Sequence, residues 1–164
     1  MRFLSLGLCL LTTACQADQP GDETVVPAVV ANSPEGIVRR IYTLPVPNFS
    51  AFHEPAQRDE FYSPATSDLI AEAENCVADR LGLPHLEFDF IVPGNDFQLT
   101  DLEVSLPEPM GAQSADVLVS FRNGGEFQQL LYQLQRRQQQ WRIHDVRFQS
   151  LTLRGELRAA CGAQ

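Results

Sequence analysis

The spacing of apolar residues changes near residue 96, and this change constrains the fold more than any other feature. Before it, apolar side chains recur at helical spacing, as at Ile37 and Ile41. After it, they alternate as in a strand, for example at Leu130, Tyr132 and Leu134. Helices followed by a run of strands predict an α+β domain. We expect the N-terminal helices to pack on a curved antiparallel sheet of about four strands.

Three helices are predicted in the first half of the chain. Ser33 is a favourable N-cap for the first, and Pro34 suits its first helical position. A short second helix is expected over 55–62. The third is expected over 68–81, with Ser67-Asp68 as its cap.

Turn residues divide the second half into strands. Asn123-Gly124-Gly125 predicts a tight hairpin, and 136–140 predicts the next turn. The strand over 141–148 has a mixture of apolar and polar residues on both faces if it alternates strictly, so its core side is open. Residues 153–161 are expected to form a terminal helix or a short closing segment.

The N-terminus has the layout of a bacterial lipoprotein export signal. Arg2 supplies positive charge, an apolar run follows, and Thr12-Thr13-Ala14 supplies small residues before Cys15. The apolar run is much shorter than the roughly 20 residues of a spanning helix. We therefore expect 1–14 to be a signal peptide, Cys15 to carry lipid, and 15–32 to be a flexible tether before one domain over 33–164.

Alternative processing would change the location of the protein. Cleavage after Ala17 would release a soluble periplasmic protein. With lipid on Cys15, the chain is expected on the outer membrane and facing the periplasm, because Gln16 is not the Asp that favours retention in the inner membrane of similar lipoproteins.

Net charge and cysteine content indicate which ligands, metals and covalent bonds to expect. The formal net charge is −9, and all twelve basic residues are arginines. An acidic chain without a basic cluster in its sequence argues against binding nucleic acid or anionic lipid. Cys76 and Cys161 remain after the signal and lipid sites are set aside, and an oxidising compartment favours a disulfide between them over two free thiols. No histidine lies at metal-ligand spacing from either cysteine, and no cofactor is expected.

Several segments resemble a bacterial domain-of-unknown-function family found in envelope lipoproteins. They are Tyr42 in the first helix, 61–64, the Phe88-Asp89-Phe90 run, 94–97 and the ending 140–147. This family is similar in fold to the cystatin-like, nuclear-transport-factor-two-like cone. The resemblance covers about 34–150 and implies architecture more than activity.

Candidate chemistry is sparse. Asp89 and Asp96 flank an aromatic loop, and a pocket there would also contain Phe88, Phe90 and Phe97. Cone-fold isomerases use a desolvated Asp base with a phenolic or acidic hydrogen-bond donor, which Tyr42, Tyr62 or Tyr132 would supply. The alternative interpretation is that each Asp bonds backbone in a turn. His144 and Asp145 are neighbours in a predicted strand and should point to opposite faces, which argues against a catalytic pair.

The main functional hypothesis is therefore a non-enzymatic envelope lipoprotein, attached to the membrane by its lipid, that binds another envelope protein or a small apolar ligand. An isomerase or hydratase that uses Asp89 or Asp96 is one alternative. An immunity-type protein that neutralises a basic toxin is another, because the chain is acidic.

Overall fold

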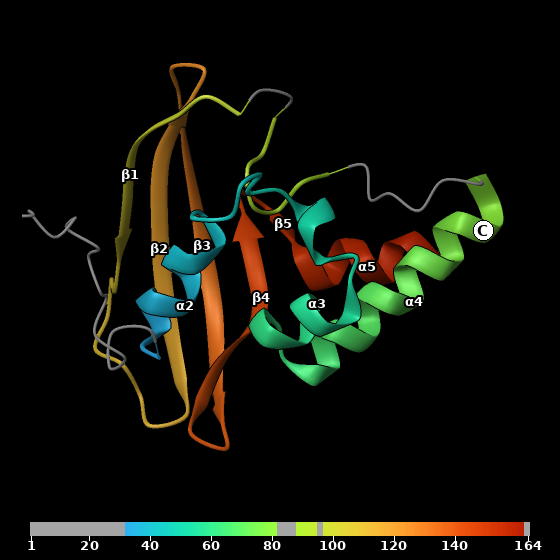
Figure 1. The fold of residues 1–164 in the computed structure, drawn as a ribbon, viewed down its shortest axis with the longest axis horizontal. Coiled ribbons are helices and arrows are strands. Elements are labelled where there is room, and N and C mark those ends of the chain that lie inside the picture. The colour runs from blue at the N-terminus through green and yellow to red at the C-terminus, as the bar shows by residue number, and fades with distance from the viewer. Residues whose placement is uncertain (1–31, 82–87, 95–96, 163–164) are drawn as a thin grey trace, which may run out of the picture.

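The computed structural model describes residues 32–81, 88–94 and 97–162 and confirms the α+β class. Helices come first and the sheet follows (Figure 1). The helical elements are α2 (Pro34–Ile41), the 3-10 turn η1 (Phe49–Phe52), α3 (Pro55–Phe61), α4 (Pro64–Leu81) and the terminal α5 (Leu153–Gly162). The strands are β1 (Leu99–Ser105), β2 (Ser114–Asn123), β3 (Glu126–Arg137), β4 (Gln140–Phe148) and β5 (Leu151–Thr152).

The sheet is an antiparallel meander in the order β1-β2-β3-β4-β5. It has five strands where about four were predicted, because two residues after β4 pair back onto it as β5. The predicted hairpin between β2 and β3 is confirmed. Gly124 and Gly125 adopt φ values of 57° and 90°, which glycine reaches without the steric penalty of a Cβ.

A β-bulge in β4 explains why strict alternation gave that strand two mixed faces. Gln133 pairs with Asp145 and Leu134 pairs with Ile143, so His144 is an extra residue without a partner in β3. The extra residue reverses the alternation. Ile143 before the bulge and Val146 after it are therefore both fully buried on the core side.

A second irregularity interrupts the alternation of faces in β1. The register shifts between Thr100 and Glu103, and Asp101 adopts a positive φ of 54°. In a regular strand Leu102 and Val104, two positions apart, would share a face. It is 40% exposed, whereas Val104 is buried.

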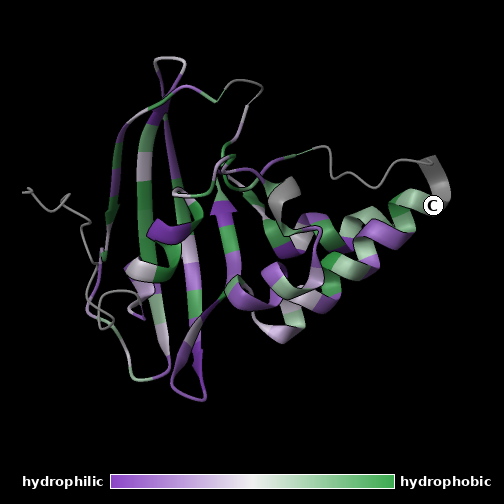
Figure 2. Cartoon of the chain, in the orientation of Figure 1, coloured by the Kyte–Doolittle hydropathy of each residue, from purple (hydrophilic) through white to green (hydrophobic). Residues whose placement is uncertain are grey.

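The helices form the other layer and close the core. Ser33 caps α2 as predicted, with its Oγ accepting from the Gly36 backbone N–H at 3.0 Å. Helix α2 crosses one face of the sheet, and α3, α4 and α5 lie beyond β4 (Figure 1). Apolar residues recur along the strands and helices (Figure 2), and the largest fully buried ones include Phe52, Phe61 and Ile70.

Helix α4 begins four residues before the predicted start. Pro64 takes the first helical position, and the Ser63 backbone oxygen accepts from the N–H groups of Thr66 and Ser67. Ser67, expected to cap the helix, lies inside it and is buried.

The predicted disulfide joins the last two helices. Cys76 of α4 and Cys161 of α5 are bonded, with a Cα–Cα distance of 5.3 Å.

Candidate functional site

Asp89 holds loops together through its carboxylate. Its Oδ1 accepts from the backbone N–H groups of Ile91 at 2.6 Å and Val92 at 3.1 Å. Its Oδ2 accepts from the Phe49 N–H at 3.0 Å. Burial raises the pKa of Asp89, and these three backbone hydrogen bonds oppose the rise. Both oxygens are thus engaged with backbone, as the turn interpretation of this residue requires.

The aromatic residues around Asp89 do not share one environment. Phe90 is fully buried in the core, and Phe88 packs on Phe90 and Phe148 with ring centroids 4.9 Å and 5.5 Å away. Phe97 is 46% exposed. Asp96 and the lipidation residue Cys15 lie outside the described residues.

The three tyrosines of the chain come together near Asp89. The Tyr42 hydroxyl donates to the Ile91 backbone oxygen at 3.0 Å, which leaves Tyr132 as the donor in the 2.9 Å contact between the Tyr42 and Tyr132 hydroxyls. The Tyr62 hydroxyl is buried and has no hydrogen-bond partner among the described residues. Burial raises the pKa of all three phenols, so they are neutral at physiological pH.

His144 and Asp145 occupy a structural junction. The Asp145 Oδ1 accepts from its neighbour Val146 N–H at 2.9 Å and from Arg154 N–H at 3.0 Å, which fixes the start of α5. The His144 Nδ1 lies 3.3 Å from the Ser63 Oγ. Ser63 is only 2% exposed, so this serine–histidine contact is closed to a substrate.

A different site forms at the turn between β3 and β4. Two adjoining cavities, of about 320 Å³ and 420 Å³, share Pro64, Arg137 and Gln138 in their walls. We call them together the turn groove. The larger one is completed by Gln113 and Arg136 and has no acidic residue in its wall. The smaller one is more mixed, and its other lining residues are Asp59, Tyr62, Ser67, Asp68, Gln140 and Arg142.

The turn that carries the groove is conformationally unusual. Gln138 and Gln139 adopt φ values of 49° and 64°, a left-handed conformation that favours glycine or asparagine. Because Arg137 pairs with Gln140, these two residues form a two-residue hairpin loop, in which positive φ values are usual, here reached without glycine. Beside the turn, the Arg136 guanidinium lies over the Trp141 ring, 5.8 Å from its centroid.

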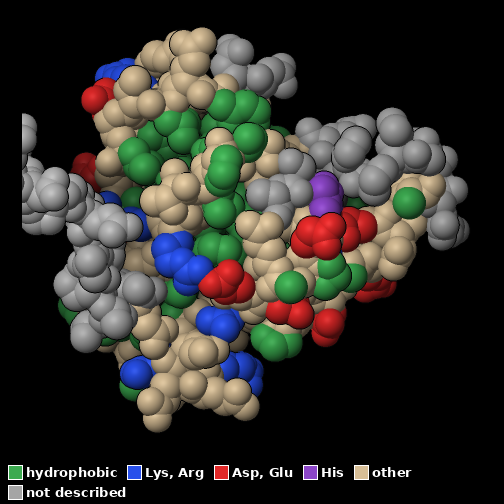
Figure 3. All heavy atoms as spheres, in the orientation of Figure 1, with side chains coloured by type: hydrophobic (Ala, Val, Ile, Leu, Met, Phe, Trp, Pro, Cys, Tyr) green, Lys and Arg blue, Asp and Glu red, His purple; other side chains and the backbone are tan. Residues whose placement is uncertain are grey.

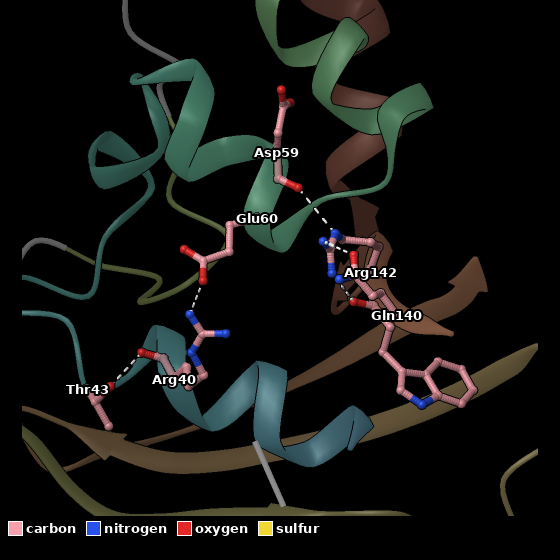
Figure 4. A network of polar contacts seen from close by, with 7 residues as sticks. Arg40, Thr43, Asp59, Glu60, Gln140 and Arg142 are labelled. Atoms are coloured by element: carbon pink, nitrogen blue, oxygen red, sulfur yellow. Dashed lines mark hydrogen bonds and ion pairs between the residues drawn. The ribbon is translucent and has the colours of Figure 1, made fainter. Parts of the chain in front are cut away.

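Arg142 contributes a further uncompensated charge. Its guanidinium donates to the Gln140 Oε1 at 2.7 Å, to the Trp141 backbone oxygen at 2.9 Å and to the Asp59 backbone oxygen at 3.2 Å. All three acceptors are neutral. The Asp59 carboxylate points away from Arg142 (Figure 4) and accepts instead from the Ser67 hydroxyl. In the same view, Arg40 is neutralised by Glu60.

More arginines continue this charge onto α5. Burial lowers the pKa of His144, and the positive charges of Arg154, Arg137 and Arg158 lower it further, while Asp145 opposes them. The Arg154 guanidinium also donates to the Thr66 Oγ1 at 2.8 Å. We call these three arginines, together with Arg136, Arg142 and His144, the arginine surface.

None of the arginines in this surface forms an ion pair with a described residue. The described ion-paired arginines are Arg40, Arg58 and Arg122, all on other elements. Basic side chains gather at the end of the molecule that carries the β3–β4 turn, and acidic ones gather over α3 and α4 (Figure 3). The adjacent Arg136 and Arg137 are visible in the sequence as two positive charges that could meet an acidic partner. The larger basic cluster is not, because its other members come from β4 and α5.

The described ranges 32–81, 88–94 and 97–162 contain neither a candidate membrane span nor a candidate metal cluster. No helix in these ranges is long and apolar enough to cross a membrane. No group of three or more His, Cys, Asp or Glu residues there is arranged to hold a metal ion.

Comparisons with known proteins leave the family open. No family model and no curated protein matches the chain. A solved structure with a related outline is a phospholipid-binding protein from Ralstonia solanacearum in complex with a phospholipid. It is 14% identical, with a TM-score of 0.34 over 80% of this chain and 72% of that chain. A likeness this distant carries no argument about function, and the arginine surface is therefore interpreted from its own chemistry.

Proposed function

We propose that this chain is a non-enzymatic lipoprotein of the bacterial envelope whose domain binds an anionic group in the turn groove. Lipid on Cys15 would attach it to the membrane, and the tether over 15–32 would connect the lipid to the domain. The observation that carries the binding proposal is the set of unpaired arginines around the groove. The chain has 21 acidic residues, yet no described carboxylate pairs with Arg136, Arg137 or Arg142.

Guanidinium chemistry defines the ligand class. Arginine presents a planar set of N–H donors that matches the oxygens of a phosphate or carboxylate, often through two parallel hydrogen bonds. Arg136 is held on the Trp141 ring and Arg142 by three neutral acceptors, so both cations are positioned before a ligand arrives. Positioned cations lose less conformational entropy on binding.

The hydrogen bonds of the Asp89 carboxylate favour a binding function over catalysis. An isomerase based on Asp89 needs a carboxylate that exchanges a proton with its ligand. Both Asp89 oxygens instead accept backbone N–H groups from two loops. The immunity-type alternative would use an acidic face such as the one over α3 and α4, whereas the arginines of the turn groove outnumber the two aspartates in its walls.

Isothermal titration calorimetry tests the proposal, with pyrophosphate and a hexaglutamate peptide as separate titrants. We expect saturable binding of at least one of them. Arg136→Gln/Arg137→Gln should weaken it at least tenfold. The matched control, Arg122→Gln/Arg147→Gln, removes the same charge from exposed positions that do not line the groove and should change affinity less than twofold. Equal losses in the two double variants, or no binding of either titrant, would contradict the proposal.

A further inference from the structure

We propose that the arginine surface binds the phosphate groups of anionic phospholipids, so that the domain rests on the membrane with its β3–β4 turn toward the headgroups. The inference rests on the proposed function, because it names the source of the anion that the turn groove binds. It also reverses the expectation from composition, which argued against contact with anionic lipid.

The point where the chain enters the domain is the first observation. The Asn32 side-chain amide donates to the Gln139 backbone oxygen at 3.2 Å. Gln139 is in the β3–β4 turn, between Arg137 and the start of β4. A lipid on Cys15 would therefore pull on the domain beside the turn groove and not at the opposite end of the sheet.

The shape of the cationic surface is the second observation. Arg136, Arg137 and Arg142 surround the groove, and Arg154 and Arg158 extend the positive charge past His144 along α5. Basic side chains thus gather at the end of the molecule that carries the β3–β4 turn (Figure 3), and Arg154 and Arg158 add positive charge on α5. A broad set of unpaired guanidinium groups matches a surface of many phosphates better than it matches one small ligand.

With lipid on Cys15, a weak contact between the domain and the headgroups is enough to hold the domain on the membrane. Cys15 and Asn32 are 17 positions apart. A flexible tether of this length would span on the order of 20–25 Å, and at most about 60 Å when fully extended. The second binding event is then intramolecular, with an effective concentration on the order of millimolar.

Net charge makes the arrangement testable. The whole chain carries a formal charge of −9 and is repelled by an anionic surface at long range. A preference for anionic vesicles therefore requires a local cationic patch that faces them. Each arginine near such a surface contributes roughly a fivefold change in partitioning, so reversing one charge should cost at least tenfold.

Vesicle co-sedimentation is the test, with the chain 15–164 carrying Cys15→Ser so that no acyl group contributes. This chain keeps every residue that the structure describes. Vesicles contain phosphatidylcholine alone or with about one-third phosphatidylglycerol. We expect binding to the anionic vesicles only, at least tenfold weaker for Arg137→Glu. Arg122→Glu makes the same change of charge at the other end of the β2–β3 hairpin and should cost less than twofold. Arg158→Glu, on exposed α5, is a second variant that should lose binding if Arg137→Glu is poorly folded.

The outcomes separate the two proposals. Equal binding to neutral and anionic vesicles, or equal losses for Arg137→Glu and Arg122→Glu, would overturn the membrane inference. Saturable binding of pyrophosphate or hexaglutamate without binding to vesicles would also overturn it and would leave the anion-binding function standing. If the protein binds neither pyrophosphate, nor hexaglutamate, nor anionic vesicles, both the membrane inference and the anion-binding function are overturned.

Discussion

Asp89 and Phe49 are joined by a hydrogen bond, at 3.0 Å, from the Phe49 backbone N–H to the Asp89 Oδ2. They are 40 positions apart, so this contact fixes the 88–94 segment against η1. The other oxygen of Asp89 accepts from the backbone N–H groups of Ile91 and Val92. One side chain therefore stabilises both η1 and the 88–94 segment.

Asp89→Asn should therefore destabilise the fold. The amide has one accepting oxygen, and whichever way it is oriented its NH₂ group faces at least one backbone N–H. We expect a loss of about 1–3 kcal/mol in the free energy of unfolding, measured by urea denaturation. Asp116→Asn is the control, since Asp116 is half-buried on β2 and should cost less than about 0.5 kcal/mol. An Asp89→Asn protein as stable as its parent would contradict the role assigned to this carboxylate.

The tyrosines should respond differently to removal of their hydroxyls. Tyr62→Phe removes a buried hydroxyl with no partner and is expected to be neutral or stabilising by about 1 kcal/mol. Tyr132→Phe removes the donor to Tyr42 and is expected to cost about 1 kcal/mol. Thermal unfolding of the two variants beside the parent measures both. If Tyr62→Phe is the more harmful change, the Tyr62 hydroxyl has a partner such as a buried water.

The disulfide should supply a large share of the stability. Cys76 and Cys161 are separated by 85 positions, and closing a loop of that length stabilises by about 4 kcal/mol in the chain-entropy account. Cys76→Ala/Cys161→Ala should lower the urea midpoint accordingly. Adding reductant should then destabilise the parent but leave the double variant unchanged. A parent protein insensitive to reductant at its unfolding midpoint would count against this contribution.

His144 should report on the charge around it. Its pKa is lowered in the fold by burial and by Arg154, Arg137 and Arg158. The unfolded chain therefore takes up the proton first as pH falls below about 6.5, and stability is lost between that pH and the folded pKa. His144→Gln should flatten this part of the pH–stability curve.

An anion on the arginine surface would oppose those cations and raise the pKa of His144. NMR titration of the His144 ring with and without saturating pyrophosphate measures the change. A pKa that does not move while pyrophosphate binds would place the anion elsewhere.

Much of the architecture follows from local sequence signals. Ser33-Pro34 begins α2, Gly124-Gly125 forms the β2–β3 turn, and the alternation at 130–134 identifies the core face of β3. These features depend on capping, on backbone sterics and on a period of two, all of which act within a few residues.

What the sequence does not reveal depends on single insertions and long-range convergence. His144 is one extra residue that reverses the faces of β4. Its only local signal is the apolar spacing of three between Ile143 and Val146, which an assumption of strict alternation overlooks. Arg137 and Arg154 are 17 positions apart and meet around His144 only because β4 and β5 turn back before α5. Two assumptions were therefore wrong: that residues of a strand alternate strictly between its faces, and that a basic surface requires basic residues close together in the sequence.

The most direct test of the anion-binding claim uses Trp141, the single tryptophan of the chain. Arg136 lies over its ring, so an anion that binds Arg136 must alter the electrostatic environment of the indole. The measurement is Trp141 fluorescence during titration with pyrophosphate, in the parent, Arg136→Gln/Arg137→Gln and Arg122→Gln/Arg147→Gln proteins. The account predicts a saturable change in the parent and in the Arg122→Gln/Arg147→Gln control, lost in Arg136→Gln/Arg137→Gln. If pyrophosphate gives a flat titration in the parent, hexaglutamate is titrated in its place; flat titrations with both anions, or the same saturable change in all three proteins, would contradict it.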